Sequence, residues 1–180
     1  MKTFNVPTAE DLTPESLALL EILNKRLGKI PNLFSVIAYS SPALSGYLQF
    51  EQDLKRGQFN PRYQEAIALV VSEVNACSYC LAGHTAAAIS RGFTIDQTLA
   101  LRSGHSQDPK LEVVLQLAQS IALNRGEADQ RLVAAFFDAG YIEPALIELV
   151  GLVTLRMFTN YVYAITKVPI DFPLVQSLME

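Results

Sequence analysis

The sequence is sparing with reactive side chains: its 180 residues include only two cysteines and two histidines. It also lacks any sustained alternation of polar and apolar residues between hairpin turns, which argues against a β-rich fold. Charged residues make up only 18% of the chain, whereas hydrophobic residues make up 50%, and this balance excludes disorder. The length predicts one domain spanning residues 1–180.

Several functions are disfavoured by what is missing. The net charge is −4 and the sequence has no basic run to neutralise phosphates, so we expect no nucleic-acid partner. The longest apolar segment carries Glu148 and Arg156 near its middle, and we therefore expect no membrane span. The N-terminal residues 1–16 lack the apolar core of a secretory signal, which predicts a cytoplasmic protein.

Residues that typically begin or end helices recur along the chain. Thr13, Ser41, Asn60 and Asp108 each precede a proline, an arrangement typical of a helix start, and residues 94–97 read as a capping box. Gly92, Gly126 and Gly140 follow apolar-periodic runs, where C-terminal caps are expected. We predict nine helices, at 14–27, 32–39, 42–54, 61–75, 77–91, 95–103, 109–125, 129–139 and 144–164. The fold is therefore predicted to be all-α, with an extended tail from Lys167.

The last predicted helix is apolar on more than one face. Such a helix is either central to the core or shared with another subunit, and the sequence leaves both open.

Both cysteines and one histidine fall within residues 77–84, CSYCLAGH. Cys77 begins a predicted helix, where the helix dipole favours a thiolate, and Cys80 and His84 follow on the same stripe. Residues three apart in a first turn have Cα atoms about 5 Å apart, within the range that a disulfide accepts. In a reducing compartment this spacing indicates a catalytic or metal-binding pair rather than a permanent cross-link.

Glu65 and His84 are the predicted proton carriers. His84 can take the proton of Cys80, or stay charged and lower the thiol pKa. Glu65 lies twelve residues before Cys77 on the preceding helix, so a short turn can bring it opposite the next helix. A carboxylate facing the core needs a partner, and we expect Glu65 to orient His84. Glu73 is expected to be solvated, His105 to lie at the surface and Tyr79 to serve in packing.

A metal site is the main alternative for these side chains. Cys77, Cys80, His84 and Glu65 could supply four zinc ligands. A compact apolar α domain does not need a metal to fold, however, and we expect neither a metal nor a cofactor. The C-x-x-C spacing could also be incidental.

The pattern E-x11-C-x-[YH]-C-x3-H, here Glu65 followed by residues 77–84, resembles the alkylhydroperoxidase D-like branch of the carboxymuconolactone decarboxylase superfamily. The upstream GKIPNLFSVIAYSSPAL and the closing NYVYAITKVPIDFP are similar to segments of the same family, the latter especially in peroxidase-related members. The resemblance implies an all-helical subunit that forms trimers or hexamers.

The resemblance also implies a thiol peroxidase that reduces hydrogen peroxide or organic hydroperoxides, with electrons from a lipoylated or thioredoxin-like protein. By analogy Cys80 attacks the peroxide, Cys77 resolves the sulfenic acid, and Glu65 and His84 relay protons. The helix dipole alone favours Cys77 as the thiolate, but that effect, about 0.3–1 kcal/mol, is smaller than a buried imidazole contact. We therefore assign the attack to Cys80.

Tyr79 departs from the best-known family members, which have histidine there. A phenol with a pKa of about 10 donates a hydrogen bond but is no base at pH 7. Two other functions stay open: a redox sensor whose disulfide alters an oligomer interface without turnover, and a decarboxylase-like enzyme. True decarboxylases of the superfamily lack the cysteine pair.

Overall fold

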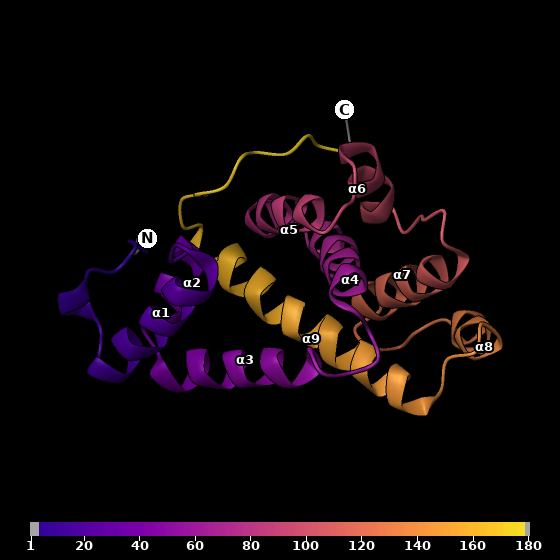
Figure 1. The fold of residues 1–180 in the computed structure, drawn as a ribbon, viewed down its shortest axis with the longest axis horizontal. Helices are drawn as coiled ribbons and strands as arrows, with labels where there is room; N and C mark the ends of the chain where they lie inside the picture. Colours follow the sequence, from indigo (N-terminus) through magenta and orange to yellow (C-terminus); the bar gives the residue numbers. More distant parts are fainter. Residues whose placement is uncertain (1–3, 179–180) are drawn as a thin grey trace.

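The structure is a computed structural model that describes residues 4–178. Within this range the chain forms nine α-helices and one 3-10 turn, and it forms no strand (Figure 1). In chain order they are η1 (Ala9–Asp11), α1 (Pro14–Leu27), α2 (Asn32–Ile37), α3 (Ser41–Leu54), α4 (Pro61–Val74), α5 (Ser78–Ser90), α6 (Ile95–Arg102), α7 (Pro109–Leu123), α8 (Gln130–Asp138) and α9 (Glu143–Thr166). The all-α prediction is confirmed, and each predicted helix is present; η1 was not predicted.

Most of the predicted caps are present. Thr13, Asn60 and Asp108 each accept hydrogen bonds from backbone N–H groups in the first turn that follows. Residues 94–97 form the expected capping box at the start of α6. At α3 the prediction was wrong by one residue, because Ser40 and not Ser41 is the N-cap, and its hydroxyl accepts from the N–H of Ala43.

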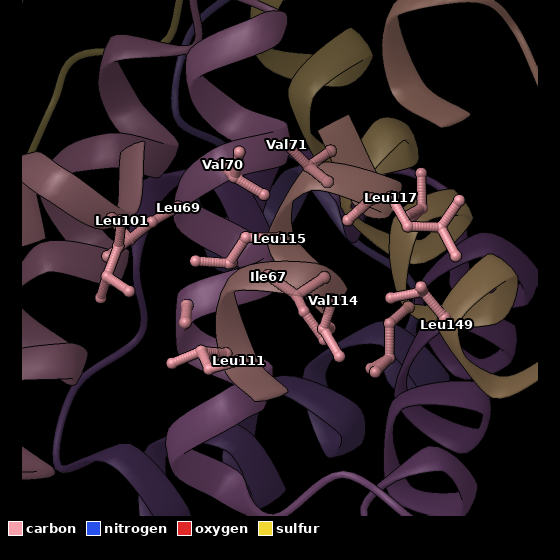
Figure 2. Close-up of a cluster of buried hydrophobic side chains, with 14 of the residues drawn as sticks. Ile67, Leu69, Val70, Val71, Leu101, Leu111, Val114, Leu115, Leu117 and Leu149 are labelled. Carbon is pink, nitrogen blue, oxygen red and sulfur yellow. The ribbon is translucent and has the colours of Figure 1, made fainter. Parts of the chain in front are cut away.

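Helix α4 lies at the centre of the fold and packs against α5, α6, α7 and α9. Its residues 66–71 are completely buried. Ile67 of α4 lies in one cluster with Leu115 of α7 and Leu149 of α9 (Figure 2). Burying each such side chain contributes roughly 1.5–3 kcal/mol, so α4 is a rigid support for Glu65, which precedes the buried run.

Helix α9 serves as a core helix and also presents an apolar face to the outside. Leu149, Leu152 and Asn160 are buried, whereas Ile147 and Ile165 are exposed. By length and apolar composition α9 could cross a membrane, which is weak evidence because core helices pass the same test. Its buried side packs against α2, α3, α4, α5 and α7, so the first of the two predicted roles is confirmed.

Residues 167–178 form neither helix nor strand, which confirms the predicted extended tail. Figure 1 shows this yellow segment leaving the end of α9, passing over α5 and ending beside α6. Arg102 at the end of α6 donates a hydrogen bond to the carbonyl oxygen of Gln176 (2.7 Å), which fixes the far end of the segment.

Candidate active site

The turn between α4 and α5 places the two cysteines. Asn75 ends α4, and its side-chain amide donates to the carbonyl of Val71 (2.9 Å) and to the side-chain oxygen of Asn160 on α9 (3.0 Å). Ala76 follows with a φ of +48°, a left-handed conformation that reverses the chain. This turn therefore fixes the position of Cys77 at the start of α5.

Cys77 is the N-cap of α5, so the helix begins at Ser78, one residue after the predicted start. Its sulfur accepts a hydrogen bond from the N–H of Cys80 (3.3 Å). The two cysteines form a disulfide, and their Cα atoms are 5.3 Å apart, close to the separation expected from the sequence. The first turn of α5 therefore accommodates the bonded pair.

Both cysteines are buried, with exposed fractions of 1% for Cys77 and 4% for Cys80. They lie in an apolar cluster that includes Leu33 of α2 and Tyr163 of α9. A thiolate formed here would be poorly solvated. The thiol therefore needs a nearby base to take its proton, or the thiolate needs a hydrogen-bond donor.

His84 and Glu65 meet as predicted. The Nδ1 atom of His84 lies 2.8 Å from a carboxylate oxygen of Glu65, and the two side chains are only 20% and 15% exposed. Arg91 approaches the other carboxylate oxygen at 3.6 Å. Burial by itself would raise the pKa of Glu65, but the hydrogen bond and charge of His84 and the charges of Arg156 and Arg91 lower it to about 2.

An ionised Glu65 decides the tautomer of His84. Because a carboxylate only accepts hydrogen bonds, the Nδ1 atom that contacts it carries a proton. In the neutral imidazole the lone pair is then on Nε2. The arrangement can therefore accept a proton at Nε2 and return it, while Glu65 stabilises the imidazolium that forms.

A buried charge network behind Glu65 was missed by the sequence analysis. The side chain of Arg156 on α9 is almost fully buried, and it donates to the hydroxyl of Tyr47 on α3 (3.0 Å). Glu51 lies 4.0 Å from Arg156 and also pairs with Arg26 (2.9 Å). Burial raises the pKa of Tyr47 to about 12, so this hydroxyl stays neutral at pH 7.

Tyr79 does more than pack. Its hydroxyl donates to a carboxylate oxygen of Asp171 in the C-terminal segment and accepts from the N–H of Leu33 (3.1 Å). Burial and the hydrogen bond to Asp171 raise the pKa of Tyr79 far above its ordinary value. Tyr79 is thus a neutral donor with both partners supplied by distant parts of the chain.

Two further sequence predictions have different outcomes. His105 is exposed, as expected, and its Nδ1 atom lies 3.9 Å from Glu112. The prediction for Glu73 was wrong: it is half-buried and accepts a hydrogen bond from the guanidinium of Arg102 (2.6 Å). Arg102 is itself buried, so it requires a carboxylate partner that the local sequence did not reveal.

Solved structures share this fold over nearly the whole chain. The debrominase Bmp8, as a cysteine-to-alanine variant in complex with 2,3,4-tribromopyrrole, is 18% identical, with a TM-score of 0.78 and coverage of 95% of this chain and 93% of that chain. An uncharacterized peroxidase-related protein from Silicibacter sp. TM1040 is 22% identical, with a TM-score of 0.77 and coverage of 97% and 91%.

A third structure is an uncharacterized peroxidase-related protein from Ralstonia eutropha JMP134, described as an alkylhydroperoxidase AhpD core. It is 15% identical, with a TM-score of 0.79 and coverage of 96% and 92%. At these identities the likeness shows the fold. No curated protein matches the sequence significantly.

The family model of the carboxymuconolactone decarboxylase family matches residues 42–120. This stretch contains α4 and α5, and with them Glu65, both cysteines and His84. The family match and the shared alkylhydroperoxidase D-like fold make the chain similar to the carboxymuconolactone decarboxylase superfamily.

Proposed function

We propose that the protein is a thiol-dependent peroxidase that reduces hydrogen peroxide or small organic hydroperoxides. One observation carries the proposal: a disulfide in the first turn of α5 precedes, on the same helix, a histidine whose Nδ1 is held by a buried, ionised carboxylate. A structural cross-link has no need of such a proton relay, whereas thiol redox chemistry moves a proton at every step.

In the first step the thiolate of Cys80 attacks one oxygen of the hydroperoxide. The O–O bond breaks, Cys80 becomes a sulfenic acid, and the alkoxide leaves with one proton as the alcohol. His84, one turn after Cys80, is the residue that takes the thiol proton and returns it to the leaving oxygen. Glu65 keeps the imidazole in the required tautomer.

In the second step the sulfur of Cys77 attacks the sulfenic sulfur of Cys80, and water leaves as the disulfide forms. An external dithiol then reduces this disulfide and becomes a disulfide itself. In sum, one hydroperoxide and one dithiol give one alcohol, one water and one disulfide. The N-cap position of Cys77, where it accepts the N–H of Cys80, suits a sulfur that leaves as a thiolate during this reduction.

Single replacements of the cysteines test the assignment. Reduced Cys77→Ser protein treated with cumene hydroperoxide should accumulate a sulfenic acid at Cys80, detected by dimedone labelling and mass spectrometry. The matched Cys80→Ser variant should give no labelled Cys77. If the label appears on Cys77 instead, the order of the two residues is reversed; if neither variant is labelled, the peroxidase proposal fails.

Reductive dehalogenation is a second candidate, favoured by the debrominase among the structural neighbours. Two thiols and a bromoarene would give the arene, hydrogen bromide and the same Cys77–Cys80 disulfide, so the site geometry alone does not separate the two reactions. The discriminating experiment offers reduced protein either cumene hydroperoxide or 2,3,4-tribromopyrrole in separate reactions. Peroxidase activity predicts thiol loss only with the hydroperoxide, whereas bromide release would favour the second candidate.

Two other functions predict different results in assays of the same protein. A redox sensor would oxidise once and show no turnover in the presence of excess dithiothreitol or reduced lipoylated protein. A decarboxylase-like enzyme would keep its activity in the Cys77→Ser/Cys80→Ser double variant. The peroxidase proposal requires continuous turnover with at least one dithiol and complete loss of activity in the double variant.

A further inference from the structure

The cysteine pair is inaccessible in the disulfide state, although reduction requires a partner sulfur to reach it. Cys77 and Cys80 are 1% and 4% exposed. Residues 168–178, which we call the C-terminal cover, contribute side chains to the apolar cluster that encloses the two cysteines. Val168, Ile170 and Phe172 of the cover belong to the same apolar cluster as the two cysteines.

Asp171 fastens the cover to the middle of the C-x-x-C segment. One carboxylate oxygen accepts hydrogen bonds from the hydroxyl of Tyr79, one of the two residues between the cysteines, and from the N–H of Asn32 (3.4 Å). The ammonium of Lys29 contacts the backbone carbonyl of Asp171 (2.7 Å) and its other carboxylate oxygen (3.4 Å). Three elements thus converge on one side chain of the cover.

Phe172 lies directly on α5. Its ring stands edge-on to the ring of Tyr79, with centroids 5.6 Å apart, and the ammonium of Lys29 lies 3.7 Å above its centroid. A Cβ atom on Gly83 would lie 3.4 Å from this ring, at van der Waals contact, so Phe172 packs against α5 at this position. Gly83 is one turn beyond Cys80 and immediately precedes His84.

Among the segments that enclose the cysteine pair, the cover is the one whose local opening costs the least free energy. Residues 168–178 form neither helix nor strand, whereas α4 and α5 contribute completely buried side chains to the main core. Segments held by a few side-chain contacts open locally before packed helices do. Loss of the Tyr79–Asp171–Lys29 contacts would release the middle of the cover, between the buried Val168 and the Arg102–Gln176 hydrogen bond, without unpacking α4 or α5.

We infer that the C-terminal cover determines which partners reach the disulfide, and that Asp171 and Phe172 are its specificity-determining residues. A small molecule needs only a slight local opening to reach the sulfurs, whereas a macromolecular dithiol reaches them only after the Tyr79–Asp171 contact opens. The inference rests on the proposed function only in taking the cysteine pair as redox-active.

The test compares two thiols of the same chemistry and different size on the oxidised protein. 2-Mercaptoethanol is the small probe, and methoxy-polyethylene-glycol thiol is the bulky one. The rate of attack on the disulfide is followed by trapping with iodoacetamide and mass spectrometry. The variants are Asp171→Ala, Phe172→Ala and Lys29→Met, and Leu174→Ala is the control because this residue of the cover is 79% exposed.

In wild-type protein the bulky thiol should react far more slowly than the small one. The three variants should raise its rate by about tenfold or more, as expected for losing a hydrogen bond to a charged group or an aromatic contact. The small-thiol rate should rise less, and Leu174→Ala should change neither. Asp171→Asn, which keeps an acceptor for Tyr79, should lie between wild type and Asp171→Ala.

Equal rate ratios in wild type and all three variants would overturn the inference. So would an equal acceleration of both thiols, since that result indicates general loosening of the fold. No peroxide enters this experiment, so its failure leaves the peroxidase proposal standing. Conversely, absence of peroxidase activity would leave the access measurement intact.

Discussion

Glu65 shows how one buried carboxylate links stability to the chemistry of the site. It is held ionised by His84, Arg156 and Arg91 against the cost of burial, with a pKa lowered from 4.5 to about 2. Because the folded-state pKa lies below the unfolded value, this contribution is complete above about pH 4.5 and is lost as the pH falls toward 2.

Replacing Glu65 with glutamine should therefore lower the free energy of unfolding by about 3 kcal/mol at pH 7. The difference from wild type should shrink as the pH falls from 4.5 to about 2, since wild-type Glu65 then becomes neutral as well. Urea denaturation at several pH values measures this. A difference independent of pH would show that the charge of Glu65 is not what stabilises the fold.

Arg156 supplies part of the charge that keeps Glu65 ionised. Arg156→Met should destabilise the protein by about 1–3 kcal/mol, because the buried hydroxyl of Tyr47 loses its donor, while Glu51 keeps Arg26 and Lys55 as partners. It should also raise the pKa of Glu65 and so shift the low-pH limb of the peroxidase rate upward in pH.

Arg26→Met is the matched control, because Arg26 pairs with the same Glu51 from a half-exposed position. It should cost at most about 1 kcal/mol and leave the pH profile unchanged. Similar losses in the two variants would contradict the view that burial of Arg156 matters.

Among the structural elements, the turn from α4 to α5 determines where the two cysteines lie. Ala76 adopts a left-handed conformation there, which costs a residue with a Cβ roughly 1–2 kcal/mol. Ala76→Gly should therefore stabilise the protein by up to about 1 kcal/mol after the added entropy of the unfolded chain.

Ala86→Gly is the comparison, because Ala86 is an exposed residue within α5. It should destabilise the protein by about 1 kcal/mol. Thermal denaturation of both variants checks the pair. If both substitutions destabilise equally, the turn is not strained at Ala76.

The elements were predictable because their signals are local. Caps such as Thr13 and Asn60 act within one turn, so sequence alone gives the bounds of α1 and α4 within a residue or so. The contact between Glu65 and His84 could be predicted because the two residues lie on consecutive helices that a short turn joins.

The long-range contacts were not predictable in this way. Tyr79 meets Asp171, and Arg156 meets Tyr47, across separations of 92 and 109 residues that only the complete fold defines. Arg156 within an otherwise apolar helix was the available sign of a buried ion partner, although nothing in the sequence identified Tyr47 or Glu51.

At the scale of the whole molecule, α9 carries exposed apolar side chains along its length. They are Ile147, Val150, Phe158, Tyr161 and Ile165. We propose that a second copy of the chain covers this face. Groups of exposed apolar side chains on one helix often mark a surface that contacts another protein.

Ile147→Lys and Ile165→Lys together should therefore shift the protein to smaller species in sedimentation-velocity experiments, without altering its helical circular dichroism. Leu174→Lys is the control, since Leu174 is equally exposed but lies outside α9. A wild-type protein that sediments as a monomer, or one whose size the α9 substitutions leave unchanged, would count against this surface.

The proposed function requires that hydroperoxide oxidises Cys77 and Cys80 as a pair. The most direct measurement mixes fully reduced protein with one equivalent of cumene hydroperoxide and counts free thiols and cumyl alcohol together. Two thiols should be lost for each alcohol formed, and Glu65→Gln should slow the loss. Thiols that persist while the hydroperoxide remains intact would contradict it.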